Sequence, residues 1–209
     1  IMSSRNLDND VEDEVVDKLV NTVDKSMPKL THRYYKWKAN QFGQTKLDWW
    51  DRNAPLPNSS KDLIKWSEAK EIILDSFTSF HPEISNLAKL FFKNNWIDAS
   101  LRKGKASGAF AHPSVPSLHP YILVNYQGKI RDVMTLAHEL GHGVHQILAG
   151  KNGLLMAETP LTLAETASVF GEMLVFRKLL DESSIVQKKQ ILSCKIEDML
   201  NTVARQIGF

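Results

Sequence analysis

Two histidines and a glutamate stand at the spacing of a zinc-binding helix. His138, Glu139 and His142 complete an H-E-x-x-H motif within LAHELGHGVHQ, residues 136–146. Side chains four residues apart lie on one face of a helix, so both imidazoles can bind the same zinc ion. Glu139 projects to one side, where it can act as a general base on a metal-bound water. The alternative is a surface helix that carries two histidines by chance. The apolar residues around the motif instead favour a buried helix, in which these groups need a partner such as a metal ion.

Zinc needs a third protein ligand. His145 follows His138 by seven residues, which is about 10 Å along a helix axis, so a role in supporting the site or facing substrate suits it better. Glu165 is the better candidate, because it lies on the next predicted helix among small residues at 164 and 166–168. Together with His138 and His142, Glu165 would complete a His₂Glu site with the fourth position open to water. Glu172, two turns further along, either accepts a hydrogen bond from a ligand histidine or is an ordinary charged residue.

The motif and its surroundings resemble the oligoendopeptidase F family of zinc peptidases, relatives of thimet oligopeptidase. The resemblance is carried by HELGHGVHQ and LTLAETASVFGEML, and upstream by RYYKWKANQFGQTKLDWWDRNAPLP and RKGKASGAFAH. It covers nearly the whole chain. It implies that His138, His142 and Glu165 hold one zinc ion per chain and that Glu139 polarises the attacking water. The implied substrates are short peptides.

The chain departs from that family in length. Family members are several hundred residues long, enclose the site between two lobes, and carry a histidine and tyrosines beyond the metal helices that stabilise the oxyanion. We therefore expect a fragment that contains the metal-binding core. Two functions stay open: a zinc endopeptidase, weakly active or inactive as this fragment, or a helical module that binds metal and peptide without hydrolysis. Exposed apolar surfaces at the cuts would favour self-association.

The predicted fold is mainly α, a helical zincin-type core with a small β-sheet before the metal-binding helix. We expect one catalytic core that comprises a helical subdomain over 1–95, short strands and loops over 96–130, and the metal-binding helices over 131–209. Gly141 and Gly143 each cost the metal helix about 1 kcal/mol in propensity, which indicates close approach of another backbone or a substrate. The periodicity and the helix-start and helix-stop residues predict helices over 11–27, 28–42, 61–80, 82–94, 131–149, 159–180 and 184–206, and strands over 108–112 and 121–126.

A small sheet beside a zinc helix can bind an extended peptide by strand addition, independently of the peptide's sequence. Gly108 and Tyr126, in and beside the predicted strands, are candidates for facing the substrate. Gly108 could equally be an ordinary turn residue. We expect the lysines of helix 28–42 to be solvated. We expect the same of the basic residues at 102, 103 and 105, which could alternatively contact a peptide carboxylate. Trp49 and Trp50 could line a binding cleft, but we expect them to act as packing anchors, because large aromatic side chains are mostly buried.

Composition narrows the function classes. The 209 residues are 43% hydrophobic and 24% charged, as in a soluble globular protein. A net charge of +2 gives no electrostatic case for binding nucleic acid, and no apolar run is long enough to cross a bilayer. No secretory signal is visible, and the single cysteine, Cys194, excludes an internal disulfide. These features predict a cytoplasmic setting.

Overall fold

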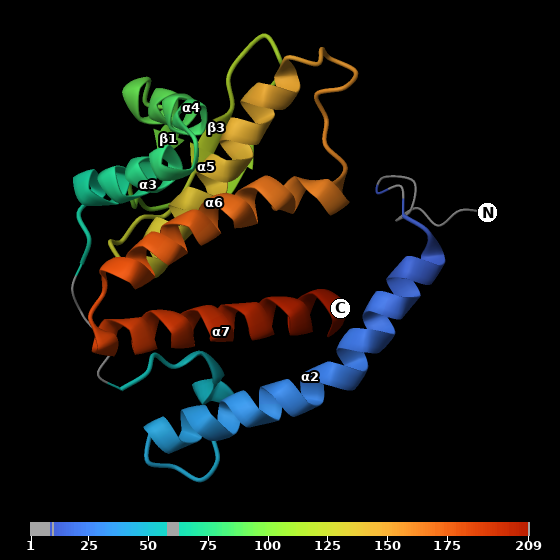
Figure 1. Ribbon diagram of the computed structural model, residues 1–209, viewed down its shortest axis with the longest axis vertical. Helices are drawn as coiled ribbons and strands as arrows, with labels where there is room; N and C mark the ends of the chain where they lie inside the picture. Colours follow the sequence, from blue (N-terminus) through green and yellow to red (C-terminus); the bar gives the residue numbers. More distant parts are fainter. Residues whose placement is uncertain (1–8, 10, 58–62, 209) are drawn as a thin grey trace. The chain divides into compact units, whose positions relative to one another are not determined.

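The computed structural model describes residue 9 and residues 11–57 and 63–208, with only the backbone at 205 and 208 (Figure 1). Its contacts divide the chain into two compact units. We call Ile1–Lys61 with Ser183–Phe209 the hairpin unit and Asp62–Glu182 the site unit. The described chain is mainly helical with a small sheet, which confirms the predicted fold class. The predicted division after residues 95 and 130 stays a prediction.

Helices make up most of the site unit. The predicted helices are present with shifted ends, and the predicted start at residue 61 lies outside the described residues. A proline and a histidine set one boundary, because the His81 ring accepts a hydrogen bond from the Glu83 N–H at the start of the helix that Pro82 opens. The elements are α3 (Trp66–Phe80), α4 (Pro82–Lys93), β1 (Ile97–Asp98), β2 (Phe110–His112), β3 (Tyr121–Leu123), α5 (Ile130–Gly150) and α6 (Leu161–Glu182).

Helices α5 and α6 pack at backbone distance, with α3 against both. A Cβ on Gly141 would lie 2.5 Å from the carbonyl oxygen of Ala167. A Cβ on Gly171 would lie 3.0 Å from the carbonyl oxygen of Ala137. Gly143 instead admits the ring of Phe91, whose Cζ would be 2.5 Å from an added Cβ. The predicted approach of another backbone is therefore confirmed at Gly141, whereas at Gly143 the neighbour is a side chain.

The core of the site unit surrounds α5. Leu136, Ala137 and Leu140 are fully buried there, and the hydrophobic cluster continues into α3, α4, α6 and the sheet. Burial of a leucine stabilises a fold by roughly 1.5–3 kcal/mol. The motif helix is thus held by apolar contacts along most of its length, which fixes the orientation of the side chains on its remaining face.

The sheet has the order β1-β3-β2, with β1 parallel and β2 antiparallel to β3. Both predicted strands are present but shorter, and β1 was not predicted because two residues carry no alternation. The backbone N–H of Ile122 donates to the Trp96 carbonyl, away from β2. Ala111 of β2 pairs with Ile122 in register. Its own N–H and C=O therefore face the outer edge of the sheet.

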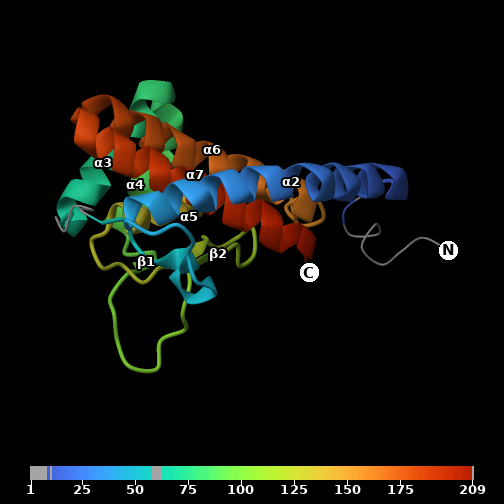
Figure 2. The ribbon, with the colours of Figure 1, turned by 90° about the horizontal axis from the view of Figure 1, so that it is seen from below.

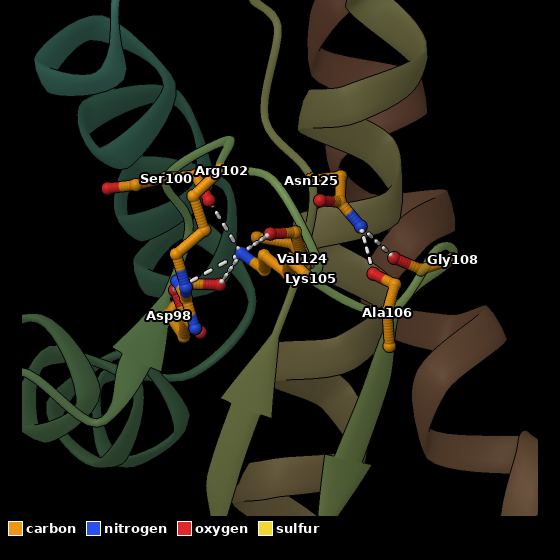
Figure 3. A network of polar contacts seen from close by, with 8 residues as sticks. All are labelled: Asp98, Ser100, Arg102, Lys105, Ala106, Gly108, Val124 and Asn125. Carbon is orange, nitrogen blue, oxygen red and sulfur yellow. Dashed lines mark hydrogen bonds and ion pairs between the residues drawn. The ribbon is translucent and has the colours of Figure 1, made fainter.

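The loop between β1 and β2 is fastened by a buried lysine (Figure 3). The Lys105 ammonium, with 1% of its side chain exposed, donates to the carboxylate of Asp98 and to the carbonyls of Asp98, Ser100 and Val124. The prediction that this lysine is solvated is wrong. Arg102 stays largely exposed while it binds the same carboxylate. Four oxygens around one ammonium replace its hydration, which is what allows it to be buried.

The hairpin unit contains α2 (Asp13–Gln41), the 3₁₀ helix η1 (Trp49–Asn53) and α7 (Ile185–Gly208). Two helices were predicted over 11–42, but α2 is one helix that continues through Pro28. Figure 1 shows that it bends part-way along its length. Proline removes one backbone hydrogen bond and bends a helix without always ending it. Packing of α2 along α7 favours continuation.

A buried ion pair joins α2 to α7. Lys38 is fully buried, and its ammonium lies 2.9 Å from a carboxylate oxygen of Glu197 and 2.7 Å from the carbonyl oxygen of Arg52. Tyr34 donates its hydroxyl to the same carboxylate. Burial, and to a smaller extent the hydrogen bond to this carboxylate, raises the pKa of Tyr34 well above its usual value. The prediction that the lysines of this helix are solvated is therefore wrong for Lys38.

The tryptophans of η1 are not packing anchors. Trp49 is 83% exposed and Trp50 64%, and they touch each other edge to face at 5.8 Å. None of the residues of η1 is buried, so the prediction that these tryptophans act as packing anchors is wrong. None of the helices among the described residues combines the length and the apolarity that crossing a bilayer requires.

Candidate metal centre

Three side chains from α5 and α6 converge on one point. His138, His142 and Glu165 each offer a ligand atom, and these atoms all lie within 4.8 Å of one another. A carboxylate oxygen of Glu165 lies 3.1 Å from Nε2 of His138 and 3.4 Å from Nε2 of His142. The edge of a tetrahedron with metal–ligand bonds of about 2 Å measures about 3.3 Å. The two separations between Glu165 and the histidines, and the nitrogen and oxygen donors, therefore fit a tetrahedral metal ion.

Groups behind the three side chains hold them in place. The other ring nitrogen of His138 lies 3.3 Å from a carboxylate oxygen of Glu172. His142 is hydrogen-bonded to the backbone of Ala164. Ser168, fully buried, donates its hydroxyl to the Glu165 carboxylate at 2.7 Å. The sequence pointed to Ser168 only as a small residue. Its position three residues after Glu165, within reach along a helix, was the available signal.

Burial and the neighbouring carboxylates shift the pKa values of the two histidines in opposite directions. Burial lowers the pKa of His138, but the carboxylates of Glu172, Glu139 and Glu165 together raise it above the usual value. Burial also lowers the pKa of His142, and there it outweighs the opposing effect of the Glu165 carboxylate. A ligand histidine must be neutral, so a bound cation would replace the proton that the carboxylates otherwise favour on His138.

Glu139 lies beside the cluster but is not part of it. Its side chain is buried, with 6% of the residue exposed, and accepts a hydrogen bond from the backbone N–H of Ala111 in β2. Burial, reinforced by the charge of Glu165, raises the pKa of Glu139 to about 7. A carboxyl group with a pKa near neutrality exchanges protons readily at physiological pH.

The other predicted site residues lie outside the cluster. His145 is partly buried, and its charge lowers the pKa of its neighbour His142. Gly108 has a φ of +86°, an added Cβ would meet nothing within 4 Å, and its carbonyl accepts a hydrogen bond from Asn125 (Figure 3). Tyr126 donates its hydroxyl to the Ile64 carbonyl at 2.8 Å, so this hydroxyl is already engaged. Substrate-facing roles for these residues stay predictions.

Comparison with known proteins identifies the family. The sequence profile of Peptidase family M3 matches residues 2–209. The chain belongs to this family. An oligopeptidase, PepF of Bacillus subtilis (strain 168), is 30% identical over 203 residues, which are 96% of this chain and 30% of PepF. An oligoendopeptidase F homolog of Borreliella burgdorferi is 32% identical over 205 residues, 96% of this chain and 34% of the homolog.

Solved structures share the fold of this M3 chain. PZ peptidase A, solved with an inhibitor, superimposes with a TM-score of 0.78 at 18% identity, covering 95% of this chain and 36% of that one. At this identity the likeness concerns the fold alone. The chain spans about a third of the length of the curated relatives it matches. The resemblance seen in the sequence is confirmed.

Proposed function

We propose that the protein containing this chain is a zinc-dependent endopeptidase that cleaves short oligopeptides. His138, His142 and Glu165 would hold the zinc ion, and Glu139 would act as the general base. The observation that carries this proposal is the convergence of three nitrogen and oxygen donors beside a buried carboxyl group. Two histidines and a glutamate, with a fourth position for water, are a ligand set typical of catalytic zinc.

Each residue has a defined task in this proposal. A zinc ion in the cluster would polarise the scissile carbonyl and lower the pKa of a bound water to about 7. Glu139 accepts the proton of the attacking water and passes it to the leaving amine. The Ala111 N–H orients the Glu139 carboxylate, which leaves its other lone pairs for the proton transfer. Glu172 accepts a hydrogen bond from His138 and so fixes the ring for coordination.

The substrate class rests on the relatives. The names oligopeptidase and oligoendopeptidase belong to proteins that match almost the whole of this chain. The sheet beside α5 supports the same class, because an edge strand binds a peptide through its backbone whatever its sequence. A cytoplasmic setting, the lack of nucleic-acid and membrane partners, and self-association through apolar surfaces stay predictions from the sequence.

Zinc titration of metal-free protein by calorimetry tests the metal site, with the Glu165→Ala variant alongside. We expect one tight site per chain that is strongly weakened in the variant. A fluorogenic peptide then tests the reaction: hydrolysis should cease with chelator and return with zinc. Glu139→Gln should keep zinc and lose hydrolysis. Peptidase activity retained by that variant, with contaminants excluded, would refute the role of Glu139.

A second candidate function is binding of metal and peptide without hydrolysis. It is supported by one feature of the sequence: residues 146–209 contain no histidine or tyrosine, so within this chain no side chain of these two types beyond the motif can donate to the oxyanion. Loss of one such donor reduces rates by about a hundred- to a thousand-fold. Turnover that depends on zinc decides for the endopeptidase, whereas peptide binding without turnover decides for the binding module.

A further inference from the structure

The outer edge of strand β2 is already occupied by side chains of α5. Ala111 directs both backbone groups outward, because its register partner Ile122 turns its N–H towards the other neighbour. The Ala111 N–H is bound by Glu139. The Ala111 carbonyl accepts a hydrogen bond from Nε2 of Gln146 at 3.3 Å. The main-chain position that an added peptide strand would use is therefore filled.

The contact from Gln146 is a poor one for this side chain. Its N···O distance of 3.3 Å exceeds the usual 2.9–3.0 Å. Its other polar atom, Oε1, is buried and finds no hydrogen-bond partner among the described residues. An amide that makes one long hydrogen bond and leaves its buried oxygen unpaired gains little free energy from this position. Gln146 can thus leave the Ala111 carbonyl at a small cost in free energy. The Ala111 N–H, in contrast, donates to Glu139, which lies beside the metal cluster.

We propose that Gln146 is a displaceable substitute for substrate, holding the Ala111 carbonyl until the backbone N–H of an extended peptide replaces it. The inference rests on the proposed function, since it assumes a peptide beside the metal cluster. Ala111 then serves both partners: its N–H keeps the general base oriented, and its carbonyl receives the peptide. Gln146 sets how strongly the edge competes for peptide backbone and so influences affinity without selecting any side chain.

The experiment uses the Gln146→Met variant of the full-length protein, because methionine keeps the length of the side chain and removes the donor. Binding of a non-hydrolysable peptide is measured by calorimetry, and KM for a fluorogenic peptide alongside. Removal of the competing donor should tighten peptide binding by about two- to tenfold, the range of one net hydrogen bond. The control is Lys151→Met, at an exposed position just past α5, which should leave binding unchanged.

A series of peptides with one amide replaced by an ester locates the N–H that takes over. One ester should weaken binding, and the loss should be greater in Gln146→Met than in the unaltered protein, where Gln146 can return to the carbonyl. This coupling between side chain and peptide is not expected if Gln146 only supports the fold. Equal losses in both proteins, or weaker binding by Gln146→Met, would overturn the inference. Failure of the proposed function would appear separately, as absence of zinc-dependent hydrolysis in the unaltered protein.

Discussion

Replacing Glu139 by glutamine should stabilise the metal-free protein at alkaline pH. The carboxyl group is buried, and burial together with the charge of Glu165 raises its pKa from 4.5 to about 7, against the opposing effects of His138 and the Ala111 N–H. The folded state therefore disfavours the ionised form. Glutamine occupies the same volume and cannot ionise, so it removes this penalty.

The sign and size of the stability change follow from the pKa of Glu139 in the unfolded and the folded state. Below about pH 4.5 the carboxyl group is protonated in both states, and the folded protein has its full stability with respect to this group. As pH rises through about 7, the unfolded state ionises first and the folded state loses stability. A difference from 4.5 to about 7 corresponds to about 3 kcal/mol at about pH 8. The advantage of Glu139→Gln should thus grow from near zero to about 3 kcal/mol.

Urea unfolding of chelator-treated protein near pH 4.5 and at about pH 8 measures this difference. Glu158→Gln, at an exposed position in the loop before α6, is the matched control and should change stability little at either pH. A Glu139→Gln effect of the same size at both values of pH would refute the reasoning, because it would show that ionisation of this residue does not differ between the folded and unfolded states.

Three further changes test the remaining contacts. Glu165→Ala should lower zinc affinity by at least about a hundredfold in calorimetry, since even supporting groups contribute about ten- to a hundredfold; unchanged affinity would remove Glu165 from the site. Gly141→Ala should destabilise the fold by about 1–3 kcal/mol in urea unfolding, because the new Cβ would lie 2.5 Å from the Ala167 carbonyl oxygen; unaltered stability would contradict that backbone contact. Lys38→Met should cost about 3–5 kcal/mol by leaving the Glu197 carboxylate without its buried partner, and adding Glu197→Gln should recover part of it; a stable single variant would show that the pair contributes nothing.

The pairing of the two histidines in the candidate metal centre could be predicted from the sequence because their spacing is local. His138 and His142 share a helix, and four residues of separation settle their geometry without knowledge of the fold. Small neighbours marked Glu165 as a residue that could approach another helix. The contact of Ser168 with Glu165 was missed although both lie on one helix, whereas the contact of Gln146 depends on a partner that a single segment does not reveal. The partner of Gln146, Ala111, lies 35 residues away in the chain.

The predictions that the lysines are solvated and that the tryptophans are packed failed for one common reason. A lysine is buried only where several oxygens replace its hydration, and for Lys38 these come from η1 and α7. Lys105 is surrounded by oxygens of Asp98 and Ser100, which precede it, and of Val124, which follows β3. A tryptophan such as Trp49 is buried only where another element covers it. Residue type gives the average tendency, but the covering element decides each case.

The glycine inside the motif sets the geometry of the candidate metal centre although it has no side chain. Gly141 lies between the two histidines, and its lack of a side chain lets the backbone of α6 approach to where an added Cβ would be 2.7 Å from Ser168 Cα. Ser168 in turn fixes the carboxylate of Glu165. A shift of α6 by about 1 Å is half the length of a zinc–ligand bond, so the third donor would leave coordination distance. The packing distance between α5 and α6 therefore also sets the spacing of the metal ligands. A substitution at Gly141 should reduce metal affinity even where the protein still folds.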